Sequence, residues 1–247
     1  MLEATASEAI FVWMKDRESG KTESIEVHDV RSALVCHRAG ASLYFRSSQE
    51  MADEFVSQMT RDVGLSFGGM FPDGAVKGEI ETFVARAGHV TDWHADYMEN
   101  FTFQLRGRKR WLLWRGPLRH PLRGCTPHFG GLDNVEQQLK VHRMSVPGMQ
   151  FRPDIDSYEE VVLEPGSAMY FPAGCWHRVE CEEDSVSINI SLVGSSWADV
   201  VADALRHKLW TDDAMRALVC VRSPTDARHQ LAALLERAAA HLRGLKP

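Results

Sequence analysis

The sequence LEPGSAMYFPAGCWH, residues 163–177, sets the fold class of this chain. Its first Pro-Gly pair marks a turn that leads into a short apolar strand, Ala168–Phe171. A second Pro/Gly turn, Pro172–Gly174, leads to a histidine that opens the next strand, His177–Cys181. Short strands joined by such turns are typical of β sandwiches and barrels. This stretch therefore predicts two strands that follow one another along the chain, with His177 at the start of the second.

The same pattern extends through the middle of the chain and predicts a mainly β protein. We expect a jelly roll of the cupin type, that is, a double-stranded β-helix, with flanking helices. One such helix is predicted at Glu50–Arg61, with Met51, Phe55 and Met59 on a face interpreted as core packing. The other predicted strands are Ser42–Arg46, Glu79–Arg86, Asp92–Tyr97, Phe101–Arg106, Arg110–Trp114, Glu160–Leu163 and Val186–Leu192.

From Ser196 the pattern becomes helical. Apolar residues recur there at helical spacing, and a second short helix is expected from Thr211. A third helix has Ser223 as its N-cap, Pro224 in its first turn and Gly244 at its far end. We therefore predict a jelly-roll domain at residues 1–195 and a helical segment at 196–247 that packs on the barrel or forms a homodimer interface. The apolar stripe of the first helix comprises Trp197, Val200, Val201, Ala204, Leu205 and Leu209.

Composition limits the partners and the compartment. The net charge of −6 gives no basic field for a phosphate backbone, which disfavours nucleic acid without excluding it. The 5 cysteines include no CxxC pair, so neither a disulfide framework nor a structural zinc site is expected. We find no signal peptide and no apolar run of about 18 residues, so a membrane partner is not expected. The prediction is an intracellular, cytoplasmic protein, or a nuclear one in a eukaryote.

A candidate metal site lies at Thr91–Asp96. Residues two apart on a strand point to the same face, so His94 and Asp96 can enter one barrel interior. With 11 His and 34 Asp and Glu, about one such pair is expected by chance, so the pair alone decides nothing. His177 adds a third ligand from another strand. Two imidazoles and one carboxylate form the facial triad that suits non-haem Fe(II) and leaves coordination positions open.

Two blocks of sequence resemble the JmjC-domain hydroxylases. The first is Glu81–Trp114 and the second is Pro165–Leu192, and the hydroxylase branch that they resemble includes the asparaginyl hydroxylase acting on hypoxia-inducible factor. The resemblance implies a 2-oxoglutarate-dependent dioxygenase that uses Fe(II) and O₂, with His94, Asp96 and His177 as metal ligands. It rests on Thr91, His94, Asp96, Asn100, Gln104, Gly107, Lys109, Trp111, Phe171, Pro172, Trp176, His177, Ser187 and Asn189.

The resemblance also implies a binding site for 2-oxoglutarate. Lys109 matches the lysine that pairs with the distal carboxylate, and a buried lysine needs such an anion. Thr91 matches a hydroxyl that binds the same carboxylate. Ser42–Arg46 resembles the strand whose tyrosine does so too, which nominates Tyr44, although core packing explains that tyrosine equally well. Asn100 and Asn189 match positions near the iron-proximal end of the co-substrate.

Departures from the family pattern narrow the chemistry. Asp96 replaces the glutamate usual in histone demethylases, which favours hydroxylation, and it argues against halogenases, whose small residue leaves room for chloride. Two alternatives stay open: a metal cupin that does not use 2-oxoglutarate, and a catalytically silent JmjC-like binding module. The sequence does not identify the substrate, which we expect to be a protein or peptide side chain or a small molecule, with a modified tRNA base remaining open. The segment Arg115–Ser157 is predicted to shape the substrate entrance.

Overall fold

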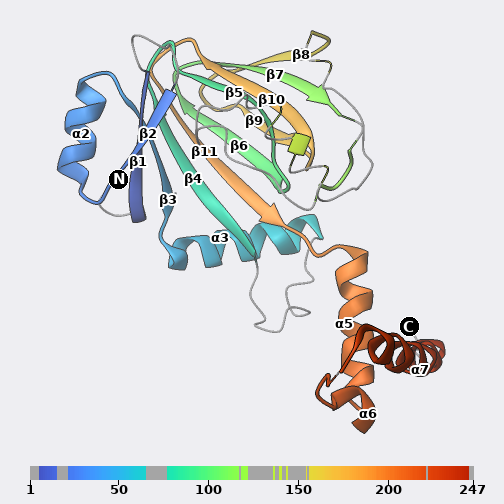
Figure 1. Cartoon of the computed structure of the whole chain (residues 1–247). Helices are drawn as coiled ribbons and strands as arrows, with labels where there is room; N and C mark the ends of the chain where they lie inside the picture. Colours follow the sequence, from blue (N-terminus) through green and yellow to red (C-terminus); the bar gives the residue numbers. More distant parts are fainter. Residues whose placement is uncertain are drawn as a thin grey trace. The chain divides into compact units, whose positions relative to one another are not determined.

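Figure 1 shows a computed structural model of the chain, which describes residues 6–15, 22–64, 77–116, 118–121, 136, 139–140, 143, 154, 156–220 and 222–244. The chain divides into two units, one of residues 1–66 and 75–194 and the other of residues 67–74 and 195–247. Most of the predicted entrance segment Arg115–Ser157 lies outside the described residues. The division of the sequence into residues 1–195 and 196–247 stays a prediction about domains.

The first unit is a two-sheet jelly roll, as predicted. Its larger sheet has the strand order β2-β1-β3-β4-β11-β6-β9, its smaller sheet the order β5-β10-β7-β8, and every pairing is antiparallel. The strands are β1 Ala6–Lys15, β2 Thr22–Val27, β3 Ser42–Ser47, β4 Lys77–Ala85, β5 Val90–Ala95, β6 Glu99–Arg106, β7 Lys109–Arg115, β8 Glu159–Leu163, β9 Ala168–Phe171, β10 Cys175–Cys181 and β11 Ser185–Val193.

The central strands β4, β11 and β6 of the larger sheet carry most of their polar side chains on one face and their apolar side chains on the other. In β11, Ser187, Asn189 and Ser191 alternate with apolar residues, and the cross-strand partners of Asn189 are Glu81 and Thr102. Because paired residues share a face, β4, β11 and β6 together line the space between the sheets with polar groups. The opposite face is apolar and is covered by α3, Gln49–Val63, through the cluster Ala52, Val56, Ile80, Ile190 and Leu192.

Helix α3 confirms the predicted helix but corrects its core face. Ser48 caps its first turn by accepting a hydrogen bond from the Met51 amide, and Gly64 ends it in the left-handed region. Met51 and Met59 pack on the apolar cluster, whereas Phe55 is 48% exposed, so its assignment to the core was wrong. The spacing of Met51, Phe55 and Met59 is helical, but the face that meets the sheet is centred on Ala52 and Val56.

The N-terminal part of the unit was missed by the sequence analysis. Strands β1 and β2 extend the larger sheet, and α2, Val30–Arg38, covers them with Ala33 buried against Ile10 and Val12. Asp29 caps this helix by accepting the Ser32 amide at 2.8 Å. The predicted strand Asp92–Tyr97 has the expected length but lies two residues earlier, since β5 is Val90–Ala95. The predicted strand Ala168–Phe171 matches β9 at both ends, and the remaining predicted strands are present with at least one boundary shifted by one or two residues.

The tight turn between β6 and β7 depends on Gly107. Its φ angle of 67° lies in the left-handed region. A Cβ atom at this position would also lie 2.2 Å from the carbonyl oxygen of Asp184. Both the backbone conformation and the close approach of a second chain segment therefore require glycine, and the turn starts β7 two residues later at Lys109.

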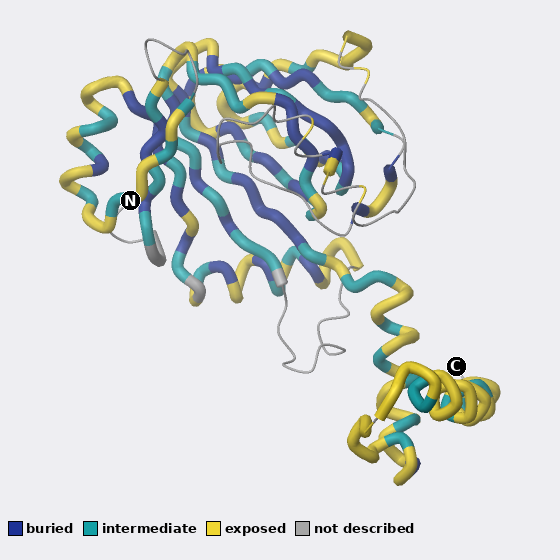
Figure 2. Tube along the Cα trace, viewed as in Figure 1, coloured by how far each residue is buried: buried dark blue, intermediate teal, exposed yellow. Residues whose placement is uncertain are grey.

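The second unit contains three helices, α5 Trp197–Leu209, α6 Asp213–Arg216 and α7 Pro224–Arg243. Ser196 and Asp199 form a capping box on α5, and Ser223 caps α7 with Pro224 in its first turn. Asp212, the N-cap residue of α6, connects α6 to α7 by accepting hydrogen bonds from Arg237 and from His241. Figure 2 shows that exposed and half-buried residues predominate in these helices, and none of the three contains a buried residue. In the described parts of the chain, no helix combines the length and apolarity that crossing a membrane requires.

Candidate metal centre

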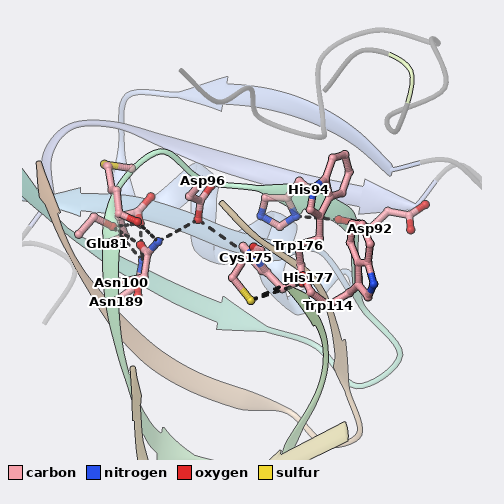
Figure 3. Close-up of polar contacts among 12 residues, drawn as sticks. Glu81, Asp92, His94, Asp96, Asn100, Trp114, Cys175, Trp176, His177 and Asn189 are labelled. Carbon is pink, nitrogen blue, oxygen red and sulfur yellow. Dashed lines mark hydrogen bonds and ion pairs between the residues drawn. The ribbon is translucent and has the colours of Figure 1, made fainter. Parts of the chain in front are cut away.

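Two neighbouring strands of the smaller sheet bring His94, Asp96 and His177 together. His94 on β5 lies directly across from His177 on β10, and Asp96 follows the last residue of β5. One ligand atom from each of the three residues lies within 4.8 Å of the other two. Asp96 therefore reaches the cluster from just beyond the strand, not from the strand itself as predicted. Figure 3 shows the three side chains converging from these segments.

The hydrogen bonds of the two histidines fix which ring nitrogen faces the cluster. Nδ1 of His94 donates to the carbonyl oxygen of Asp92 at 2.7 Å, and Nδ1 of His177 donates to that of Cys175 at 3.0 Å. With the proton held on Nδ1, the lone pair of each ring lies on Nε2, the form in which imidazole binds metals. Nε2 of His177 lies 3.7 Å from Oδ2 of Asp96.

Burial shapes the charge state of the cluster. It lowers the pKa of His177 well below its ordinary value, and the neighbouring His94 adds to this effect, so the ring is neutral at physiological pH. Burial also raises the pKa of Asp96, while His94 and a hydrogen bond from Asn100 oppose that rise. A divalent cation would offset the cost of burying this carboxylate and would use the neutral imidazoles as ligands.

Lys109 lies in the same cavity, and its amino group is buried. It is 4% exposed, its Nζ donates to Oγ of Ser187 at 2.6 Å, and it lies 5.3 Å from the centre of the Phe83 ring. Within the described part of the chain no carboxylate forms an ion pair with it. Burial removes water from the amino group, and because no carboxylate compensates for that loss, the pKa of Lys109 is lowered. The position is suited to an anionic group from outside the protein.

Three of the other four predicted binding residues line the cavity, and the fourth does not. Thr91 lines it on the β5 side, half-buried. Tyr44 also lines it, but its hydroxyl donates to Oε1 of Glu81 at 2.7 Å. Asn189 lines it from β11, and Asn100 lies behind the wall, completely buried. The hydroxyl of Tyr44 thus already has an acceptor within the protein.

The cavity that contains these residues has a volume of about 670 Å³ and extends away from the metal cluster along the larger sheet. Its far part is lined by residues of β1 and β2, including Phe11, Trp13 and Glu26. Cavities of this size hold small ligands or substrate side chains. Sequence reasoning missed this wall because the two strands themselves were missed.

Two glutamates on β4, Glu79 and Glu81, were also missed as residues of the site. Glu79 forms an ion pair with Arg46 at 2.6 Å. Burial and the nearby Glu81 nevertheless raise the pKa of Glu79 to about 7. Burial also raises the pKa of Glu81, against hydrogen bonds from Asn189, Tyr44 and Ser191. The alternation Glu-Ile-Glu in a strand was the available signal, but it is equally typical of a solvent-exposed face.

We expect the Glu79→Gln variant to lose part of the pH dependence of stability. A carboxyl whose pKa rises on folding, here from 4.5 to about 7, stabilises the folded state below the lower value and loses that contribution as the pH rises through the upper one. The free energy of unfolding of the wild type relative to the variant should therefore fall between pH 4.5 and 7, by on the order of 1 kcal/mol. Urea titrations at several pH values measure this difference, and parallel profiles would contradict the prediction.

The jelly roll and its cluster of two buried histidines and one partly exposed aspartate define the class of metal-binding double-stranded β-helix proteins. Within that class, the family model for the JmjC domain matches residues 75–200, half of the chain. The chain belongs to the JmjC-domain family. The resemblance seen in the sequence is thereby confirmed, and the match contains His94, Asp96, Lys109 and His177.

Several proteins are similar to this chain. An uncharacterised Bacillus subtilis protein, YxbC, is 26% identical over 191 residues, which cover 75% of this chain and 54% of that protein. Human ribosomal oxygenase 1 is 30% identical over 111 residues, 43% of this chain and 14% of that protein. The chain thus covers about half of the length of YxbC and a much smaller share of the length of ribosomal oxygenase 1. The structure of the Escherichia coli ribosomal oxygenase YcfD with cobalt and 2-oxoglutarate covers 95% of this chain and 56% of that chain, with 17% identity and a TM-score of 0.49.

Proposed function

We propose that this chain is an Fe(II)- and 2-oxoglutarate-dependent oxygenase that hydroxylates its substrate. The observation that carries the proposal is the buried side chain of Lys109, which has no carboxylate partner among the described residues and shares one cavity with the cluster of His94, Asp96 and His177. A metal cupin without 2-oxoglutarate has no need for an unpaired buried cation at this position, because burying such a charge is unfavourable. The names of the ribosomal oxygenases among its relatives support the same activity.

The residues of the cavity are suited to bind both Fe(II) and 2-oxoglutarate, which the proposed activity requires. Two imidazoles with free Nε2 atoms and one carboxylate form a donor set that suits Fe(II). In the same cavity, Oδ1 of Asn189 and Nε1 of Trp111 are buried without a hydrogen-bond partner among the described residues. Buried polar atoms in proteins almost always have partners. A polar co-substrate in the cavity would supply them.

The roles of the residues follow from these positions. His94, Asp96 and His177 would hold the metal from one side, so its other positions face the cavity. Lys109 would bind the distal carboxylate of 2-oxoglutarate, with the hydroxyl of Thr91 beside it. The rings of Trp111 and Phe171 pack on His177 and limit the access of water. When bound, the iron and 2-oxoglutarate supply the oxidising chemistry, in which O₂ is consumed and succinate and CO₂ are released.

For the substrate we propose a protein side chain. The support is twofold: the ribosomal oxygenases found among the relatives, and a cavity that extends past the metal cluster along β4, β3, β1 and β2 of the larger sheet. A small-molecule substrate is the alternative. The test is a succinate-release screen of the iron-loaded protein against peptide, metabolite and RNA pools. Succinate release stimulated by a peptide pool would support the proposed protein substrate. Release with metabolites alone would indicate a small-molecule substrate instead. Failure to bind 2-oxoglutarate would reject the proposed activity.

We also propose that the C-terminal helices form a homodimer interface. On α7, Leu231, Leu235 and Leu242 share one face and are 47% to 58% exposed. Trp197 and Val201 on α5 are exposed as well. Apolar side chains gathered on one surface in this way mark an interaction site.

Truncation after Ser195 is therefore expected to cause aggregation or a change of oligomeric state, which light scattering coupled to size-exclusion chromatography measures. Replacing Leu231 and Leu235 by Gln should have a similar effect on the mass in solution. Replacing Glu236, an exposed neighbour on the same helix, by Gln is the matched control and should leave the mass unchanged. A truncated protein with the same number of subunits, stability and activity as the full chain would contradict the proposal.

A further inference from the structure

A chain of buried polar side chains connects Glu81 to the carboxylate of Asp96 (Figure 3). Oε2 of Glu81 accepts a hydrogen bond from Nδ2 of Asn189 at 2.9 Å, and the same amide nitrogen lies 2.9 Å from Oδ1 of Asn100. Nδ2 of Asn100 in turn lies 3.3 Å from Oδ2 of Asp96. The groups come from β4, β11 and β6, so the connection depends on the register of the larger sheet.

The available hydrogens determine how the Asn100 amide is turned. Asn189 has two N–H groups, which suffice for Glu81 and for Asn100. The single hydroxyl hydrogen of Ser191 has two acceptors within reach, Oδ1 of Asn100 at 2.8 Å and Oε2 of Glu81 at 3.2 Å, and the shorter contact assigns it to Asn100. On its other side, Nδ2 of Asn100 faces two acceptors, Asp96 and the carbonyl oxygen of Met98 at 2.9 Å. A rotated Asn100 amide would place its oxygen against both acceptors and its NH₂ against both donors.

Glu81 is the group that holds this arrangement from the far end. Its Oε1 accepts from the hydroxyl of Tyr44, and its Oε2 faces Asn189. If the carboxyl is protonated, Oε1 can carry the proton and share it with Tyr44, so Oε2 accepts in either state. Asn189 therefore always meets an acceptor on the β4 side and turns its NH₂ group toward Glu81 and Asn100. Without that acceptor, the remaining partner of the Asn189 amide on this side is Oγ of Ser191 at 2.9 Å, a hydroxyl that can accept or donate and so does not fix the orientation of the amide.

We infer that Glu81 is a positioning residue for the metal centre, acting through Asn189 and Asn100 to keep an N–H donor on the carboxylate of Asp96. This inference rests on the proposed metal site. Partners that orient a metal ligand through hydrogen bonds typically contribute 10-fold to 100-fold to metal affinity. Glu81 does not touch the metal ligands itself, so its effect should require Asn100.

The experiment measures the affinity of the full-length protein for Co(II), by titration of the visible absorption of the bound ion. Glu81→Leu removes the acceptor and should weaken Co(II) binding by about 10-fold to 100-fold and shift the absorption bands. Glu81→Gln can keep its oxygen toward Asn189 and its NH₂ toward Tyr44, and should stay within about 3-fold of the wild type. Glu23→Gln is the matched control, because Glu23 is an exposed carboxylate of β2 that does not line the cavity, and this variant should keep the Co(II) affinity of the wild type.

A double-mutant cycle decides whether the effect passes through Asn100. If it does, Glu81→Leu combined with Asn100→Leu should bind Co(II) no more weakly than Asn100→Leu alone. Additive effects, or a folded Glu81→Leu protein with the affinity and spectrum of the wild type, would overturn the inference. So would a Glu81→Gln protein as weak as Glu81→Leu, since the charge and not the acceptor would then matter.

A smaller substitution covers the case in which Glu81→Leu does not fold. Ser191→Ala removes one donor to Oδ1 of Asn100 and should weaken Co(II) binding several-fold, and an unchanged affinity in that variant would overturn the inference. Circular dichroism of each variant separates a folding defect from a change in the metal site. Failure of the wild type to bind Co(II) at all would reject the proposed metal site, whereas intact binding in every variant would reject only the role of Glu81.

Discussion

The Lys109→Met variant is expected to lose its affinity for 2-oxoglutarate by about two to four orders of magnitude while keeping its affinity for the metal. Methionine retains most of the volume of the side chain but no charge. The distal carboxylate would then be buried without its partner, and breaking a buried ion pair in this way costs about 3–5 kcal/mol. The hydrogen bond from Lys109 to Ser187 shows that the lysine points into the cavity and away from bulk water.

Anaerobic calorimetric titrations with Fe(II) and then with 2-oxoglutarate measure the two affinities separately. Arg46→Met is the matched control, since Arg46 also lines the cavity but is half exposed and already paired with Glu79. Its 2-oxoglutarate affinity should stay close to that of the wild type. Unchanged 2-oxoglutarate binding by Lys109→Met would refute the role of Lys109, and joint loss of metal binding would indicate a damaged fold.

Replacing any of His94, Asp96 and His177 by Ala should abolish binding of Fe(II) and turnover without unfolding the jelly roll. Loss of a hydrogen-bonded outer partner costs 10-fold to 100-fold in metal affinity, so loss of a ligand should exceed about 100-fold. The fold should persist because these side chains face the cavity, where burial lowers the pKa of His177 and raises that of Asp96. Removing a poorly solvated polar group from such a place has little cost for stability.

Metal binding is measured by equilibrium dialysis and stability by thermal unfolding. His28→Ala provides the matched control, because His28 lines the far part of the same cavity with a 78% exposed side chain. It should bind metal as the wild type does. Wild-type turnover by any one of the three alanine variants would show that the residue is not a ligand.

The site residues that could be predicted from the sequence share one property: their positions follow from the spacing of residues within a short stretch of chain. His94 and Asp96 are two residues apart, and Lys109 follows a glycine turn that begins a new strand. The turn residues before His177 place it in the strand beside them. In each case a short stretch of chain contains both the reactive residue and the geometry that aims it into the barrel.

Glu81 could not be found in this way, because its partners are distant in sequence. Tyr44 lies 37 residues before it, and Asn189 lies 108 residues after it. The alternation of β4 gives a period of two but does not tell which face meets the cavity. In this fold the polar face is the inner one, because α3 covers the apolar face.

The predictions for the N-terminal elements and for Phe55 were wrong for a related reason, namely that their structure depends on contacts with distant parts of the chain. Strand β2 has charged residues at Glu23 and Glu26 and little apolar content, so its sequence does not indicate a strand. It forms because β1 offers it an edge to pair with. Phe55 is apolar at a position that helix geometry turns to solvent, and only the placement of α3 on the sheet decides which positions are covered.

The steric situation of Gly107 has a consequence for the comparison of relatives. A side chain at this position would collide with the backbone of Asp184, and the φ angle would strain it in addition. Natural selection would therefore remove substitutions here in any protein that keeps this hairpin, whether or not that protein retains a functioning metal site. Invariance of this glycine among homologues would consequently record the ancestry of the fold and carry no information about catalysis, whereas variation at Lys109, two residues further on, would separate lineages that have kept the co-substrate from those that have abandoned it.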